Sequence, residues 1–198
     1  MPVEEYQMET TMEKRDHSVS VGEAHLYGML TPLPFIALLV ALFVSVWGWE
    51  HLVRESFVAL SNGAASIMAL LVGVVAHELL HGLAWGYFGR KPLCALKFGF
   101  QWKTLTPYAH CKEPLPLDAY RLGSAAPGVV LGFVPAIISV FTGDAGSLLF
   151  GLLFTLAAGG DFLVLWLLRA VPAGSLVEDH PTRAGCFVLE SKPVALGV

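Results

Sequence analysis

Charged residues are scarce in this sequence: Asp, Glu, Lys and Arg make up 14% of its 198 residues, against 55% hydrophobic residues. Soluble domains usually carry about 25% charged residues. The shortage excludes an ordinary water-exposed surface, and we expect much of the surface to contact lipid. The net charge of −4 provides no basic excess, so no nucleic-acid partner is expected.

Cysteine is also scarce, and its three residues, Cys94, Cys111 and Cys186, are widely separated. The odd number and the wide spacing exclude a disulfide framework and a CxxC metal pair. The first thirty residues lack a short apolar core followed by a cleavage site. A cleaved signal peptide is therefore not expected, and the membrane segments are expected to direct their own insertion.

The sequence does contain long apolar stretches. A bilayer crossing needs about 20 apolar residues, and four stretches qualify, at residues 33–49, 62–89, 122–142 and 147–168. The sequence predicts an all-α polytopic membrane protein with four transmembrane helices in a single domain, residues 33–171. Polar tails, residues 1–32 and 172–198, are expected on either side of this domain.

Basic residues are distributed unevenly between the predicted connections. Eleven of the twelve lie in or beside the two tails or in the segment 90–121, and they are Lys14, Arg15, Arg90, Lys91, Lys97, Lys103, Lys112, Arg121, Arg169, Arg183 and Lys192. Arg54 alone lies in a connection on the other side. Because cytoplasmic loops carry an excess of Lys and Arg, we expect a multi-pass protein of the cell membrane with both termini and the segment 90–121 in the cytoplasm.

The segment between the second and third predicted helices shows a strand pattern. From Leu96 to Trp102, apolar and other residues alternate, which is typical of a strand with one apolar face. Residues 104–109 are a candidate second strand, which Pro107 would confine to a sheet edge. A short β-strand or hairpin element is therefore expected here, where its edge could pair with an extended peptide.

Ionisable residues inside the predicted helices are limited to His77, Glu78 and His81 in the second helix and Asp161 in the fourth. Such groups are costly in hydrocarbon, by about 2.5 kcal/mol or more each, and usually mark a functional site. His77, Glu78 and His81 form an HExxH motif, in which the two histidines lie one helical turn apart and face the same way. This arrangement suits one zinc ion per chain, with Glu78 as a catalytic base that is not a ligand. The alternative is that the three side chains only form hydrogen bonds between helices.

Asp161 is the expected third ligand, because catalytic zinc usually has three protein ligands and one open position. His81 lies nine residues before Arg90 and Asp161 eight residues before Arg169, which places both at about the same depth. The alternative is that Asp161 forms a hydrogen bond with the backbone of the third predicted helix or transfers protons. His110 and Glu113 are alternative ligands or substrate contacts, although a solvated cytoplasmic turn is the preferred interpretation of both.

The residues from His77 to Ala84, with Phe88-Gly89 closing the helix and the alternating strand through Phe98-Gly99-Phe100, resemble the site-2 protease group of intramembrane zinc metalloproteases. Within it, the sequence is most similar to a small bacterial membrane family described as putative zincin peptidases. The resemblance covers about residues 70–170. It implies a zinc endopeptidase that cuts membrane-embedded substrates near the cytoplasmic face, with an aspartate of a later helix as third ligand. The sequence departs from the group around Asp161, because glycines precede it and no Asn-Pro element is present.

The expected partners are thus the lipid bilayer and a membrane protein or peptide substrate, and the sequence carries no signal for an oligomeric state. Two other interpretations use the same residues. One is an ion- or proton-coupled membrane carrier, which usually shows internal repeats that this sequence lacks. The other is an inactive metal-binding scaffold that holds a partner helix.

Overall fold

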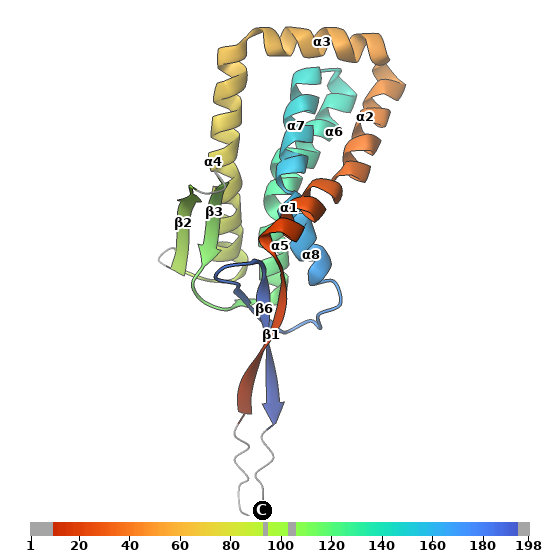
Figure 1. Cartoon of the computed structure of the whole chain (residues 1–198). Helices are drawn as coiled ribbons and strands as arrows, with labels where there is room; N and C mark the ends of the chain where they lie inside the picture. The colour runs from red at the N-terminus through yellow and green to blue at the C-terminus, as the bar shows by residue number, and fades with distance from the viewer. Residues whose placement is uncertain (1–9, 93–94, 103–105, 194–198) are drawn as a thin grey trace, which may run out of the picture.

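Helices run along the molecule between a small sheet at one end and a crosswise helix at the other (Figure 1). The computed structural model describes residues 10–92, 95–102 and 106–193. The helices are α1 (Val21–Leu30), α2 (Leu33–Trp47), α3 (Trp49–Ser61), α4 (Gly63–Phe88), α5 (Leu117–Pro127), the π-helix η2 (Gly128–Phe133), α6 (Val134–Thr142), α7 (Ala145–Ala157) and α8 (Gly159–Leu167). The strands are β1 (Thr10–Val19), β2 (Leu96–Gln101), β3 (Thr106–Cys111), β4 (Leu115–Pro116), β5 (Leu176–Asp179) and β6 (Ala184–Pro193).

Three helical segments within these described residues are long and apolar enough to cross a membrane: Val21–Trp47, Gly63–Phe88 and Leu117–Thr142. A fourth is possible if α7 and α8 count as one broken span. The first segment starts twelve residues before the predicted one, because α1 continues into α2 with a break only at Thr31 and Pro32. These lengths are compatible with a membrane protein.

The span predicted at residues 147–168 is not one straight helix, because α7 and α8 meet at an angle of 45°. The helix breaks at Ala158, which is followed by Gly159 and Gly160, and glycine is a weak helix former. A close contact also accounts for the first glycine. The carbonyl oxygen of Gly28 in α1 would lie 1.8 Å from a Cβ atom at Gly159. The break places Asp161 in the first turn of α8.

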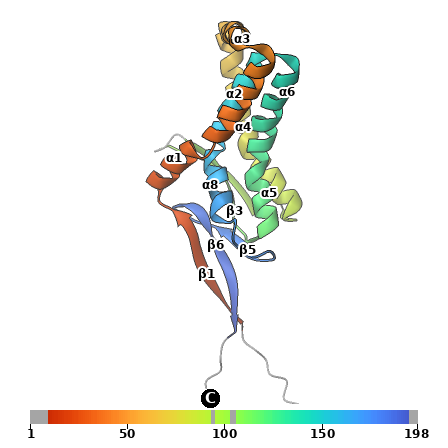
Figure 2. The ribbon, with the colours of Figure 1, turned by 90° about the vertical axis from the view of Figure 1, so that its right-hand side faces the viewer.

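A four-stranded sheet with the order β1-β6-β5-β4 joins the two predicted tails. Its longest ladder pairs β1 with β6 antiparallel, from Thr10 opposite Pro193 to Val19 opposite Ala184. Figure 2 shows this ladder as an arm that extends beyond the helices. The sequence predicted polar tails and a strand element only in the segment 90–121, so this sheet is an unpredicted part of the fold.

β2 and β3 form a separate two-stranded antiparallel sheet between α4 and α5 in the chain, beside α4. Leu96 lies opposite Cys111 and Gln101 opposite Thr106. Both strands shift little from the predicted ranges. Gly82 of α4 makes room for the sheet, because a Cβ atom there would lie 2.4 Å from the Phe98 ring.

Two buried clusters hold the helices at their opposite ends. One packs residues of α2, α3, α6 and α7 near the crosswise helix, with Phe43 and Leu148 fully buried. The other joins α4 and α5 to the sheets, with Leu117 and Leu168 fully buried. The two histidines of the candidate metal site lie on the part of α4 that leads into this second cluster.

Candidate metal centre

α4 presents its two histidines to the interior of the molecule. His77 and His81 are 9% and 6% exposed, and their rings meet edge to face with centroids 5.0 Å apart. Leu79 and Leu83 of the same helix are 46% and 61% exposed. A helix repeats its direction about every four residues, so one face of α4 carries both imidazoles while another is apolar and open to the surroundings.

Asp161 of α8 faces both imidazoles. One carboxylate oxygen, Oδ2, lies 3.3 Å from Nε2 of His77, and the other, Oδ1, lies 3.3 Å from Nε2 of His81. One ligand atom from each of the three residues falls within 4.8 Å of the others. The structure therefore brings together the three residues that the sequence predicted as ligands.

The orientation of His81 is fixed by α5. Its Nδ1 donates a hydrogen bond to the backbone oxygen of Gly123 at 2.9 Å, since a carbonyl oxygen only accepts. The His81 ring stacks on Trp85, which stacks on Tyr120. Gly123 permits this packing, because a Cβ atom there would lie 2.1 Å from the Trp85 ring. A second hydrogen bond of this kind is the usual means by which proteins orient a metal-binding histidine.

The donor set fits a metal cation. With Nδ1 protonated, a neutral His81 presents the lone pair of Nε2 to the Asp161 carboxylate. Two acceptors at this distance repel one another unless a cation or a proton lies between them. Nδ1 of His77 is buried and has no hydrogen-bond partner among the described residues. Two imidazole nitrogens and a carboxylate match the ligand chemistry of zinc.

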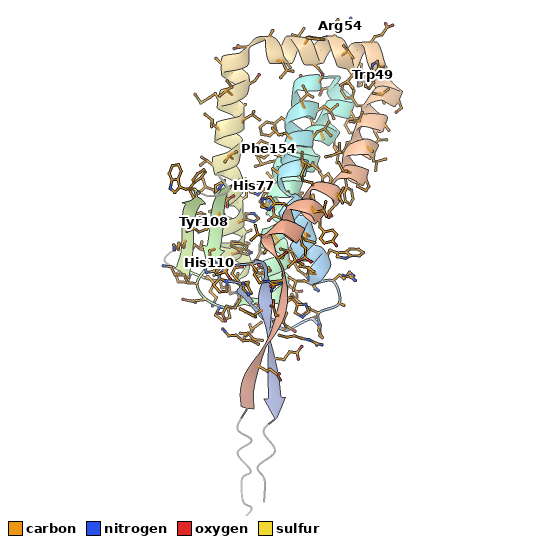
Figure 3. All side chains as sticks on the ribbon, viewed as in Figure 1. Trp49, Arg54, His77, Tyr108, His110 and Phe154 are labelled. Atoms are coloured by element: carbon orange, nitrogen blue, oxygen red, sulfur yellow. The ribbon has the colours of Figure 1, made fainter. Side chains whose placement is uncertain are left out.

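The three residues lie in a cleft of about 790 Å³. Its walls come from α4, α5, α7 and α8, from β2 and β3, and from the turn that joins β5 to β6. Glu78 lies on this cleft beside the candidate ligands. In Figure 3, His77 lies between Phe154 of α7 and His110 of β3 along the length of the molecule. β3 contributes residues 107–110 to the wall, more than the neighbouring β2.

The alternative ligands have other partners. Nδ1 of His110 lies 3.0 Å from Asp179 Oδ2, so His110 lines the cleft outside the three-residue cluster. The hydrogen bond with Asp179 raises the pKa of His110 above its ordinary value, against the opposing effect of partial burial. Glu113 forms an ion pair with Lys91 at 2.9 Å and belongs neither to the cluster nor to the described lining of the cleft.

Sequence reasoning missed Asp179 and Tyr120. Asp179 accepts hydrogen bonds from the Tyr120 hydroxyl at 2.7 Å and from the backbone N–H of Cys111 at 3.0 Å, in addition to its contact with His110. Asp179 lies in the predicted C-terminal polar tail, where a single aspartate does not indicate a functional site. The apolar run from Cys186 to Leu189 was the available signal for a strand there.

Comparison with known proteins identifies a family. A family model described as "Putative zincin peptidase" matches residues 70–176, just over half of the chain. The matched range includes the two histidines, Glu78 and Asp161, and it ends at the first residue of β5. Searches of curated proteins and of solved structures give no match.

Proposed function

The chain belongs to the family of putative zincin peptidases, and on that premise we propose that it is a zinc metalloendopeptidase that cleaves membrane-embedded polypeptides. The observation that carries the proposal is the meeting of His77, His81 and Asp161 from two apolar segments, with Glu78 on the same cleft. Such a set in a low-charge chain is costly unless it binds a cation.

The chemistry divides between the metal and Glu78. When bound, zinc would supply a Lewis acid that polarises the scissile carbonyl and makes water more acidic. The Glu78 carboxylate accepts the proton of the attacking water and returns it to the leaving amide nitrogen. Asp161, His77 and His81 hold the ion, while the Gly123 carbonyl keeps His81 in the tautomer that binds it.

An intramembrane location is supported by the surface around the candidate ligands. The exposed side chains next to them on α4 are apolar, including Val75, Leu79 and Leu83, each 40% or more exposed. The cleft nevertheless has polar walls toward the terminal sheet, where Lys97 and Arg183 lie. We propose that water enters from this end, which the charge distribution of the sequence assigns to the cytoplasm.

The substrate segment must be extended to reach the metal, because a helix hides its amide groups in its own hydrogen bonds. We propose that it lies along β3, since residues 107–110 of this strand line the cleft. β3 pairs with β2 on one side only in the described sheet. β2 lines the cleft only with Lys97 and Phe100 among the described residues.

Metal content and cleavage test the proposal. Zinc per chain is measured in detergent-purified full-length protein, and cleavage is measured on a membrane-inserted peptide. We expect about one zinc per native chain, strong zinc loss in His77→Ala and Asp161→Ala, and normal zinc without cleavage in Glu78→Gln. Glu113→Gln is the matched control, because this carboxylate lies outside the described lining of the cleft and should affect neither quantity.

Three results would contradict the proposal. A native chain that neither carries nor takes up a divalent metal excludes the zinc site. Undiminished cleavage by Glu78→Gln with normal zinc excludes Glu78 as the base. Zinc flux through proteoliposomes without peptide cleavage would identify a carrier instead.

A further inference from the structure

The cleft has a basic rim on the side nearest the terminal sheet. We use this name for four residues that line the cleft: Lys97 of β2, His110 of β3, and His180 and Arg183 of the turn between β5 and β6. They come from two separate sheets on the walls of one cavity. The proposed peptidase chemistry uses none of them.

His110 is the best-anchored member of the rim. Its Nδ1 is held by Asp179, which is itself fixed by the Tyr120 hydroxyl and the Cys111 backbone N–H. Asp179 has a side chain only 12% exposed, whereas that of His110 is 32% exposed. With Nδ1 engaged, the other ring nitrogen of His110 is the one available to a ligand in the cleft.

Lys97 lies directly opposite His110 in the β2–β3 ladder. Residues opposite one another in a sheet share a face, so the Lys97 and His110 side chains lie side by side. The ring of His180 is also oriented, because its Nδ1 accepts hydrogen bonds from the backbone N–H groups of Thr182 and Arg183. A neutral His180 therefore carries its proton on Nε2 and can donate it.

The acidic residues of the cleft do not neutralise the positive charge of the basic rim. Among the described lining residues there are three carboxylates, Glu78, Asp161 and Asp179. The first two belong to the candidate metal centre, and Asp179 already accepts from three groups. Asp16 lies outside the described lining of the cleft and partly offsets the positive charge of Arg183. Its interaction with Arg183 and His180 is one cause of its lowered pKa.

We propose that the basic rim binds a carboxylate of the polypeptide in the cleft and so selects substrates with an acidic residue, or a free C-terminus, beside the apolar segment. This inference rests on the proposed peptidase function. Transmembrane segments usually carry Lys and Arg at their cytoplasmic ends, and the rim repels such segments. The rim thus excludes the commonest membrane helices and admits a minority with acidic flanks.

The charge of His110 is part of this selection. Asp179 and Glu178 of β5 raise its pKa, while Lys97 of β2 and partial burial lower it, with a net rise. The preference for a carboxylate is therefore strongest below pH 6.5, the ordinary pKa of histidine, and weakens as the pH rises through the raised pKa of His110.

Binding to full-length Glu78→Gln protein tests the inference without depending on turnover. The probes are labelled peptides in zwitterionic detergent that share one apolar segment and differ in two flanking residues, Glu-Glu, Gln-Gln or Lys-Lys. Two more neutral peptides end at the same position with a free carboxylate or an amide, which separates a side chain from a C-terminus as the ligand. We expect the Glu-Glu peptide to bind about tenfold more tightly than the Gln-Gln peptide at low salt, with the difference shrinking in high salt.

Charge exchange provides the decisive comparison. Lys97→Glu should abolish the preference for the Glu-Glu peptide and favour the Lys-Lys peptide. A misfolded variant could not gain such a preference. Arg169→Glu is the matched control, because Arg169 lies over the Trp166 ring outside the described lining of the cleft, and it should keep the native order.

Each other outcome has a defined meaning. Equal binding of all five peptides overturns the inference, as does an unchanged order in Lys97→Glu. Displacement of the acidic peptide by phosphatidylglycerol but not by phosphatidylcholine would assign the rim to lipid headgroups and also overturn it. If the acidic peptide binds selectively but the native, zinc-loaded protein cleaves none of the peptides, the carboxylate site stands and the proposed peptidase function fails.

Discussion

Two adjacent glycines before Asp161 should respond in opposite ways to the same substitution. A Cβ atom at Gly159 would lie 1.8 Å from the backbone oxygen of Gly28, whereas a Cβ atom at Gly160 meets nothing within 4 Å. Backbone atoms cannot rotate away, so Gly159→Ala must push α1 and α8 apart. Such overpacking costs about 1–3 kcal/mol. Gly160→Ala should instead stabilise α8 by up to about 1 kcal/mol, because alanine is the better helix former.

The two variants should therefore differ by about 2 kcal/mol or more in the free energy of unfolding. For a chain of this size, this corresponds to a gap of about 4–8 °C in melting temperature. Gly159→Ala should also lower zinc occupancy, because Asp161 follows two residues later in the displaced turn. Thermal unfolding in detergent and zinc analysis of both variants provide the measurements. Equal melting temperatures and equal zinc contents would refute the role assigned to the contact between α1 and α8.

Three further predictions concern the walls of the cleft. Gly123→Ala should weaken zinc binding, measured by chelator competition, because a Cβ atom there would lie 2.1 Å from the Trp85 ring and displace the carbonyl that orients the metal-site histidine. Tyr120→Phe should lower the free energy of unfolding by about 1 kcal/mol in chemical denaturation, since it leaves Asp179 with one donor fewer. The stabilisation from the His110–Asp179 pair should be complete below pH 6.5, the ordinary pKa of histidine, and should be lost as the pH rises through the raised pKa of the folded state. Stability against pH, compared with His110→Gln, checks this, and an identical profile in both proteins would contradict it.

The candidate ligands could be predicted because their signals are local. Two histidines four residues apart on a helix share a face whatever surrounds them. The choice of Asp161 needed only a comparison of depths along two helices that run in the same direction. The motif also made Glu78 stand out, although its role as a base stays a prediction.

The terminal sheet could not be predicted because its signal is not local. β1 carries four consecutive charged residues, Glu13 to Asp16, and shows no apolar alternation. Its partner β6 lies more than 160 residues later in the chain, from Ala184 to Pro193. Strand pairing over such a separation depends on tertiary contacts that no short window of sequence contains.

The break between α7 and α8 could not be predicted from the sequence for a different reason. An apolar composition over residues 147–168 satisfies the length rule for a span whether the helix is straight or bent. The two glycines are visible in the sequence, but the segment that packs against them is not. In the structure, Gly159 makes room for α1, a helix that the sequence had assigned to a polar tail.

The pairing of β1 with β6 also determines the order in which the molecule can be assembled. Residues 10–19 leave the ribosome early, but their partner strand is made only after the helices that the structure describes and after the candidate metal ligands. A chain truncated before residue 180 would keep both histidines and Asp161 but would lack the cleft wall formed by the β5–β6 turn. Translation that stops before Ala184 would leave β1 without its ladder, and the cleft would lack His180 and Arg183 as an ordered pair.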